Sequence, residues 1–371
     1  MQTLTTSKKP VKVNFGHFNF ARGIGIIAVI LAHTYAHLDM AQATRLTVLK
    51  TINLVIGPGI MPMFFMISGY GFKPKSFKKI LGTSVRELLV PYIFIMMGYL
   101  SVFPLFHYQV TFDGSLYHTL DFARKYLLAF VFGTSKIGVT LLGRQSAWCV
   151  AAWFFLALFL ATNILNLILK VKDLTIQVIL VLLSVATSIV LYELEFWYYC
   201  LPQGLMAVAY VYIGYIFKKY NLLAKLQVCP LTYLILGPIL YLQLEHGGFD
   251  LSQGAFRNIY LDNLAALLSG ILFLCLFSLP ERSEWKCWDG LKQIGLYSYW
   301  ILVIHSIEME ALPWWPWQRC LEDQQWHALF GELFIKLVIY IVFCYLMKKF
   351  NKLRYQLAAK KKLARRQASN A

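Results

Sequence analysis

Two ionisable residues, Arg22 and His33, lie eleven positions apart within one apolar segment, FNFARGIGIIAVILAHTYAH. Ionisable side chains inside an apolar span are costly, so each is a candidate for function. Eleven residues make almost three helical turns, which puts both side chains on one helix face, about 16 Å apart. A guanidinium is a permanent cation suited to phosphate or carboxylate, and an imidazole can accept a proton from a hydroxyl. This spacing favours transfer from a donor held near Arg22 to an acceptor near His33.

Three further polar residues in apolar segments are candidates. His305 and Glu308 are three positions apart and therefore share a helix face, where they can orient an acceptor hydroxyl or form a second proton relay. Ser68, within ISGY, can act as a nucleophile that holds a covalent intermediate, or donate a hydrogen bond to an oxyanion. Structural interpretations compete with these. Arg22 can reach lipid phosphate, and both histidines can bond between helices. Ser68 can simply allow close helix packing beside its glycines.

The elements that must position these residues are membrane helices. Of the 371 residues, 58% are hydrophobic and 14% are charged, whereas soluble domains carry about 25% charged residues. The apolar residues form blocks long enough to cross a bilayer as helices. We therefore predict an all-α, polytopic integral membrane protein with about ten transmembrane helices, and an amphipathic interfacial or re-entrant helix at 115–133. The predicted spans are 18–38, 51–72, 87–107, 147–169, 174–192, 202–217, 230–244, 261–279, 293–312 and 329–348.

The net charge of +17 indicates orientation and lipid contact rather than a nucleic-acid partner. With ten spans, 25 of the 35 lysines and arginines fall on the side of the N-terminus. Cytoplasmic loops are enriched in these residues, so both termini are predicted to be cytoplasmic. Residues 1–17 are the expected N-terminal segment, 18–348 the membrane-embedded domain, and 349–371 a basic tail on anionic head groups. We expect the first span to be retained, because no small-residue cleavage site follows it.

The loops and cysteines are less specific. Seven cysteines without metal-ligand spacing are expected to be packing residues, and no metal is predicted, although a Cys200–Cys320 bridge on the outer side is an alternative. The aromatic loops YELEFWYYC and PWWPWQRC indicate an interfacial belt, or alternatively platforms that stack on sugar rings. Asp250 and Asp262 are expected to be ordinary loop acids, although they can also bind glycan hydroxyls.

Several stretches, in the same order along the chain, resemble the acyltransferase type 3 family and cover about residues 15 to 310. They are RGIGIIAVILAH, which resembles the family's R-x(10)-H signature in the first span; PMFFMISGYGF, which resembles its second-span FFFxSGF stretch; VRELLVPYIF, which resembles its R-x-L-L-x-P-Y stretch before the third span; and IGLYSYWILVIHS, which resembles its late G-x-x-S-Y-x-I-Y-x-x-H stretch. WFFLALFLA and LPQGLMAVAYVYIGYIFKK resemble the branch that includes fucose 4-O-acetylase-like proteins.

The resemblance implies a membrane-embedded O-acyltransferase of the plasma or inner membrane. It implies acetyl-CoA or another acyl-CoA as donor and a surface polysaccharide or lipid-linked sugar as acceptor. It assigns the family's essential residues to Arg22 and His33, with His33 as general base. It assigns contacts with the CoA phosphates to Arg86 and to the lysines Lys78 and Lys79. A second arginine often follows in the family, but this chain has Glu87 there, so the lysines are expected to share the role as point charges.

A function of another class also fits these spans. Polar residues inside a multi-span bundle suit a non-enzymatic exporter or transporter of a surface glycan or its lipid-linked precursor. If the protein is an enzyme, its acceptor can also be a small molecule, a lipid or a peptide. Dependence on acyl-CoA separates the enzyme from the exporter, because an exporter needs no thioester.

Overall fold

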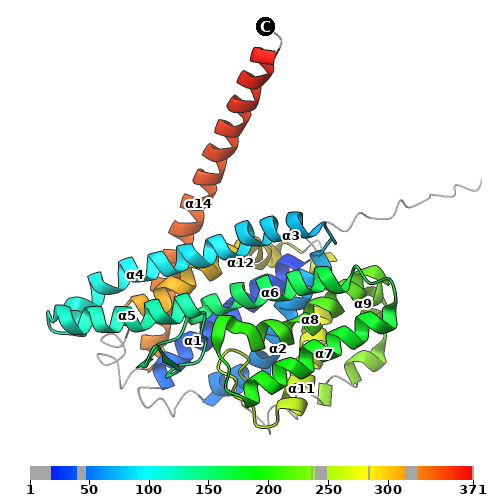
Figure 1. Ribbon diagram of the computed structural model, residues 1–371, viewed down its shortest axis with the longest axis horizontal. Helices are drawn as coiled ribbons and strands as arrows, with labels where there is room; N and C mark the ends of the chain where they lie inside the picture. The colour runs from blue at the N-terminus through cyan, green and yellow to red at the C-terminus, as the bar shows by residue number, and fades with distance from the viewer. Residues whose placement is uncertain are drawn as a thin grey trace, which may run out of the picture.

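The computed structural model describes residues 18–39, 47–234, 237–238, 249–282, 285–314 and 325–369. Figure 1 shows a bundle of long helices from which the last helix projects. The predicted all-α membrane fold is confirmed. The longer helices are α1 (Asn19–Asp39), α2 (Thr47–Gly71), α3 (Phe77–Ser84), α4 (Val90–Val110), α5 (Leu116–Phe132), α6 (Trp153–Ile168), α7 (Leu174–Glu193), α8 (Leu201–Lys219), α9 (Leu222–Val228), α11 (Ile259–Phe277), α12 (Asp289–Ala311) and α14 (Gln325–Ser369).

Seven helical segments within the described residues are long and apolar enough to cross a bilayer. The predicted spans 51–72 and 293–312 form helices α2 and α12, which are not among these seven, and 230–244 lies mostly outside the described residues. Helix α12 packs against α1, α4 and α14. Because protein encloses it, it can carry polar residues that lipid would not tolerate. The seven segments are Asn19–Ala36, Phe77–Val110, Val150–Ile168, Leu174–Glu193, Tyr198–Lys219, Ile259–Phe277 and Trp326–Phe350.

One predicted boundary differs from the structure. The third span does not begin at 87, because α3 continues through a π-helical turn, Val85–Leu89, into α4. Pro91 causes no break, since a proline in the first turn of a helix removes no needed donor. The last predicted span, 329–348, falls within the apolar segment Trp326–Phe350, and α14 continues beyond this segment to Ser369. The lysine, arginine and alanine residues of that tail are strong helix formers.

The packing of α1 against α12 depends on glycine. A Cβ on Gly295 of α12 would overlap the Asn19 carbonyl oxygen, and a Cβ on Gly23 of α1 would overlap the Leu291 carbonyl oxygen. The two backbones can therefore approach closely only because both positions lack a side chain, as is common between membrane helices. This contact fixes the helix that carries Arg22 against α12.

The predicted amphipathic segment 115–133 is confirmed as helix α5. The Ser115 hydroxyl caps its first turn by accepting from the His118 amide, and Gly133 ends it in the left-handed conformation at φ 58°. Helix α5 packs along α4 (Figure 1). Two short strands that the sequence did not predict follow it as an antiparallel hairpin, β1 (Thr140–Leu141) and β2 (Arg144–Gln145).

The buried thiol of Cys200 donates to the Gly133 carbonyl oxygen, 3.0 Å away. Its suggested partner Cys320 lies outside the described residues, as does most of the PWWPWQRC loop. The Cys200 contact joins the end of α5 to the start of α8.

Candidate functional site

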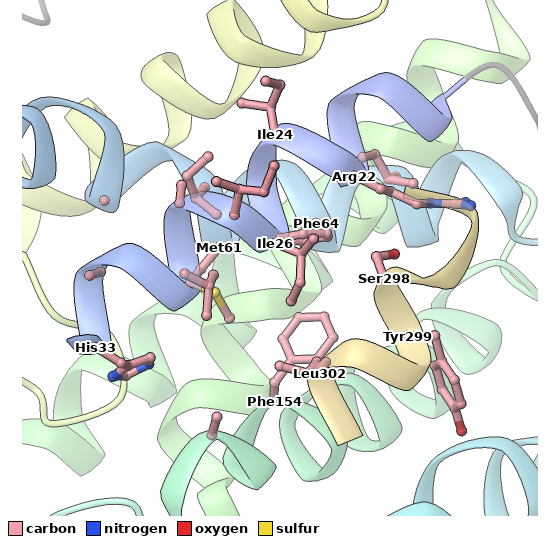
Figure 2. A pocket seen from close by; sticks show the side chains of 18 of the residues that line it. Arg22, Ile24, Ile26, His33, Met61, Phe64, Phe154, Ser298, Tyr299 and Leu302 are labelled. Carbon is pink, nitrogen blue, oxygen red and sulfur yellow. The ribbon is translucent and has the colours of Figure 1, made fainter. Parts of the chain in front are cut away.

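One cavity of about 490 Å³ contains both Arg22 and His33 in its wall. Figure 2 shows the two side chains at opposite ends of this cavity. Its wall comes mainly from α1, α2, α6 and α12. Between the two ends the wall is largely apolar. Examples of these apolar residues are Ile26, Met61, Phe64, Phe154 and Leu302. An elongated ligand with one anionic end and an uncharged chain fits this arrangement.

The Arg22 end of the cavity lies beside the first half of α12. Figure 2 shows the Arg22 side chain directed towards the segment that carries Ser298 and Tyr299. The Tyr299 hydroxyl donates to the Glu87 carbonyl oxygen at 2.8 Å, which ties α12 to the π-helical turn. Leu88 of that turn also lines the cavity. The π-helical turn before α4 is therefore part of the cavity mouth, and such turns are frequent at functional sites.

The three basic residues assigned to the donor phosphates lie outside the cavity wall. Lys78, Lys79 and Arg86 are exposed, on α3 and on the π-helical turn. The Arg86 guanidinium lies 3.2 Å from the Glu87 carboxylate, and these side chains are 70% and 59% exposed. Arg86 is two residues before Leu88, so this basic surface begins next to the mouth rather than inside it.

Two aromatic rings from other segments accompany His33 at the opposite end. The centroid of the His33 ring lies 5.4 Å from that of His305 and 6.5 Å from that of Trp148. His33 and Trp148 are half-buried, whereas His305 is fully buried. Asp250 and Ser252, from the loop before α11, also line the cavity. Asp250 was expected to be an ordinary loop acid, with binding of glycan hydroxyls as the alternative, and sequence patterns gave no sign that its loop reaches this cavity.

Glu308 orients the imidazole of His305. Its carboxylate oxygen Oε1 lies 2.8 Å from His305 Nδ1 and accepts from the Tyr340 hydroxyl at 2.7 Å. The Tyr340 oxygen is itself 3.0 Å from Nδ1. Because a carboxylate can only accept, Nδ1 carries the proton and the ring is held in one tautomer. The pair predicted from its i, i+3 spacing is therefore in contact.

A buried lysine from the last helix joins the same network. Lys336 Nζ lies 2.7 Å from Glu332 Oε1 and 3.8 Å from Glu308 Oε1, and it donates to Thr34 Oγ1 at 3.0 Å. Thr34 neighbours His33 in the chain, so the network connects α14 and α12 to the catalytic candidate. Lys336 and Glu332 are not among the residues predicted from the sequence. Their i, i+4 spacing within an apolar helix was the signal that could have identified them.

Ser68 lines the cavity, but its hydroxyl donates to the Phe64 carbonyl oxygen of the preceding turn at 3.0 Å. Such a bond is common for serine inside a helix. The neighbouring Gly69 packs directly on the backbone of Val211 in α8, where a Cβ would overlap it. The ISGY stretch thus provides the close helix packing that was the alternative to catalysis.

Comparison with known proteins identifies the class. The model of a protein family described as an acyltransferase domain, that of the acyltransferase type 3 family, matches residues 16–349. The chain therefore belongs to the acyltransferase type 3 family, and it is a multi-pass membrane acyltransferase. Neither the search of curated proteins nor that of solved structures found a match.

Proposed function

We propose that this protein is a membrane-embedded O-acyltransferase, and specifically an O-acetyltransferase. It transfers the acyl group of acyl-CoA to a hydroxyl of a cell-surface or lipid-linked carbohydrate. The observation that carries the proposal is that one largely apolar cavity has Arg22 at one end and His33 at the other.

The donor enters at the Arg22 end. Arg22 binds a phosphate of CoA, because guanidinium matches phosphate geometry and keeps its charge. Lys78, Lys79 and Arg86 add positive charge on the surface beside the mouth, where the remaining phosphates of CoA lie in solvent. The uncharged pantetheine arm then follows the apolar wall past Phe64 towards His33. Since the basic segments mark the cytoplasmic side, the donor comes from the cytoplasm.

His33 acts as the general base at the far end. Its imidazole takes the proton from the acceptor hydroxyl while that oxygen attacks the thioester carbonyl carbon. The carbon–sulfur bond then breaks, and His33 returns the proton to the departing CoA sulfur. The adjacent His305, held by Glu308, helps to position His33. The buried network around His305 also stabilises the positive charge that His33 gains with the proton. No acyl-enzyme intermediate is needed, since the acceptor attacks the donor directly.

The acceptor reaches His33 from the opposite side of the plasma or inner membrane. Trp148 is half-buried beside His33 and offers an aromatic face to a sugar ring. The Asp250 carboxylate accepts hydrogen bonds from the Ser252 amide at 2.8 Å and from the Ser252 hydroxyl at 2.6 Å. Asp250 lines the same cavity, so its carboxylate can also accept a hydrogen bond from a sugar hydroxyl.

The competing hypothesis from the sequence is a glycan exporter without chemistry. A path for a sugar polymer needs polar groups along its whole length. The cavity wall between Arg22 and His33 is instead largely apolar, with Ile26, Phe64 and Leu302 among its residues. This favours an acyl chain donor over a polysaccharide as the occupant.

The test is turnover of labelled acetyl-CoA by the purified protein in lipid, with a crude cell-surface glycan extract as acceptor. His33→Ala is expected to lower transfer by roughly 10²-fold or more, as for loss of a general base. His327→Ala, an exposed histidine of α14, is the matched control and is expected to keep full activity. Transfer retained in His33→Ala contradicts the role of this residue. If wild type neither binds nor turns over acyl-CoA, the exporter hypothesis is favoured.

A further inference from the structure

A second, strongly charged pocket lies between α5 and the β1–β2 hairpin. Its volume is about 240 Å³, and Leu128 is the one apolar residue among those that line it. The residues that line it are Asp121, Arg124, Lys125, Leu128, Arg144 and Gln145. The family's activity and the cavity between Arg22 and His33 do not account for it.

Three cations in this pocket share one carboxylate. Lys125 Nζ lies 3.3 Å from Asp121 Oδ2, whereas Arg124 Nη2 and Arg144 Nη1 lie 3.6 and 4.0 Å from Asp121 Oδ1. The pocket therefore carries two positive charges in excess. Like charges held this close repel one another, and an anion relieves the repulsion. Arg124 Nε is buried and has no hydrogen-bond acceptor within the described part of the chain, so the guanidinium keeps an unused donor.

The pocket is close to the proposed transfer centre. The amide of Ala147 donates to the Lys125 carbonyl oxygen at 3.3 Å. The next residue, Trp148, has its ring centroid 6.5 Å from that of His33. One hydrogen bond and one peptide unit therefore connect the charged pocket to the aromatic ring beside the general base. A ligand that spans them would contact both.

The positive charge of the pocket is not explained by the orientation of the protein in the membrane. Arg124, Lys125 and Arg144 fall on the predicted outer side, where lysine and arginine are depleted in multi-span proteins. These three are nevertheless gathered around a single acid, and their side chains are only 40 to 57% exposed. Asp121 balances only one of the three positive charges, and an anionic ligand accounts for the remaining two.

We propose that this pocket binds an anionic group of the acceptor, a carboxylate or a phosphate, and thereby places a neighbouring hydroxyl at His33. The proposal rests on the proposed O-acyltransferase activity and adds the class of acceptor, an acidic glycan. Arg124 and Arg144 provide planar donor pairs that match either oxyanion, and Lys125 adds a point charge. Asp121 holds the three cations in place before the ligand arrives.

The first test measures binding, which does not require turnover. The full chain in nanodiscs of phosphatidylcholine alone is titrated with galacturonate hexamer, inorganic pyrophosphate and, as the uncharged comparison, galactose hexamer. At least one of the two anions is expected to bind, whereas galactose hexamer is not. Arg144→Gln is expected to weaken anion binding by about tenfold, the range for one charge-assisted hydrogen bond. Lys136→Gln removes a cation that lies over Trp197, outside the pocket, and is expected to bind like wild type.

The second test separates the possible sources of the anion. Transfer from labelled acetyl-CoA to acidic and neutral pools of the glycan extract is compared, with and without phosphatidylglycerol in the nanodiscs. Arg144→Gln should raise the KM for the acidic pool and leave acceptor-independent thioester hydrolysis unchanged. Equal use of both pools, or an Arg144→Gln protein that matches Lys136→Gln in both tests, overturns the proposal. A variant that loses only a response to phosphatidylglycerol also overturns it and assigns the pocket to lipid head groups. If the wild-type protein shows no thioester turnover, the acyltransferase proposal is refuted instead. The binding test still decides whether this pocket binds anions.

Discussion

The imidazole rings of His33 on α1 and His305 on α12 lie 5.4 Å apart between centroids, at the end of the cavity opposite Arg22. One ring is half-buried in the cavity wall, and the other is fully buried behind it. Glu308 and Tyr340 hold the buried ring by its Nδ1 atom. The half-buried His33 can thus react in the cavity, while the fully buried His305 fixes its surroundings.

This arrangement predicts that Glu308→Gln and Tyr340→Phe impair chemistry more than donor binding. Glu308→Gln removes the charge that holds His305 in one tautomer, and kcat is expected to fall by roughly 10²-fold, the lower range for a disturbed acid–base group. Tyr340→Phe leaves the Glu308–His305 contact in place, so a smaller fall is expected. The KM for acetyl-CoA should stay near its wild-type value in both. A raised KM with unchanged kcat would show that His305 serves the donor site instead.

The buried Lys336 predicts a charge effect on stability. Lys336→Met leaves the carboxylates of Glu332 and Glu308 without their shared cation, at 0% and 3% side-chain exposure. Breaking a buried ion pair in this way costs about 3–5 kcal/mol. The thermal unfolding midpoint in detergent should therefore fall clearly. The double variant Lys336→Met/Glu332→Gln removes one of the two carboxylate charges and should recover part of the loss. A double variant no more stable than the single one would argue against charge imbalance as the cause.

The local part of this site could be predicted from the sequence, because helix geometry alone determines it. Arg22 and His33 share a face of α1, and Glu308 meets His305 one turn along α12. Contacts between distant segments could not be predicted in this way. Nothing in the spacing of α1 indicates that His33 meets His305, or that Lys336 of α14 reaches Thr34.

The directions of the side chains at the cavity mouth could not be predicted from sequence patterns either. The resemblance assigned Arg86 to the CoA phosphates, and its side chain lies exposed beside Glu87, outside the cavity wall. A π-helical turn changes the angular position of each residue between α3 and α4, so helical periodicity could not indicate which residues of this stretch line the cavity. The β1–β2 hairpin has two residues in each strand, too few for a period-two pattern to be recognised.

The close crossing of α1 and α12 predicts a specific intolerance. Gly295→Ala would press a methyl group into the Asn19 carbonyl oxygen, so the helices must separate, at a cost of about 1–3 kcal/mol or more. Because both helices line the cavity, transfer activity should fall with stability. Gly290→Ala in the same helix meets nothing within 4 Å and is the control. Its stability should be unchanged or raised by up to about 1 kcal/mol, since alanine favours helix. Equal unfolding midpoints for the two variants would contradict the close crossing.

Ser68 provides the last prediction, which separates direct transfer from an acyl-enzyme mechanism. Its hydroxyl is engaged with the Phe64 carbonyl oxygen, and removing it leaves a small apolar residue in the cavity wall. Ser68→Ala should therefore keep kcat within a few-fold of wild type. Ser68→Leu should lose activity, because its larger side chain narrows the donor path beside Phe64. Mass spectrometry of the protein after incubation with acetyl-CoA alone should show no acetyl group on Ser68. A stable acetyl adduct in wild type that disappears in Ser68→Ala, together with loss of transfer, would require a two-step mechanism in which Ser68 is the nucleophile.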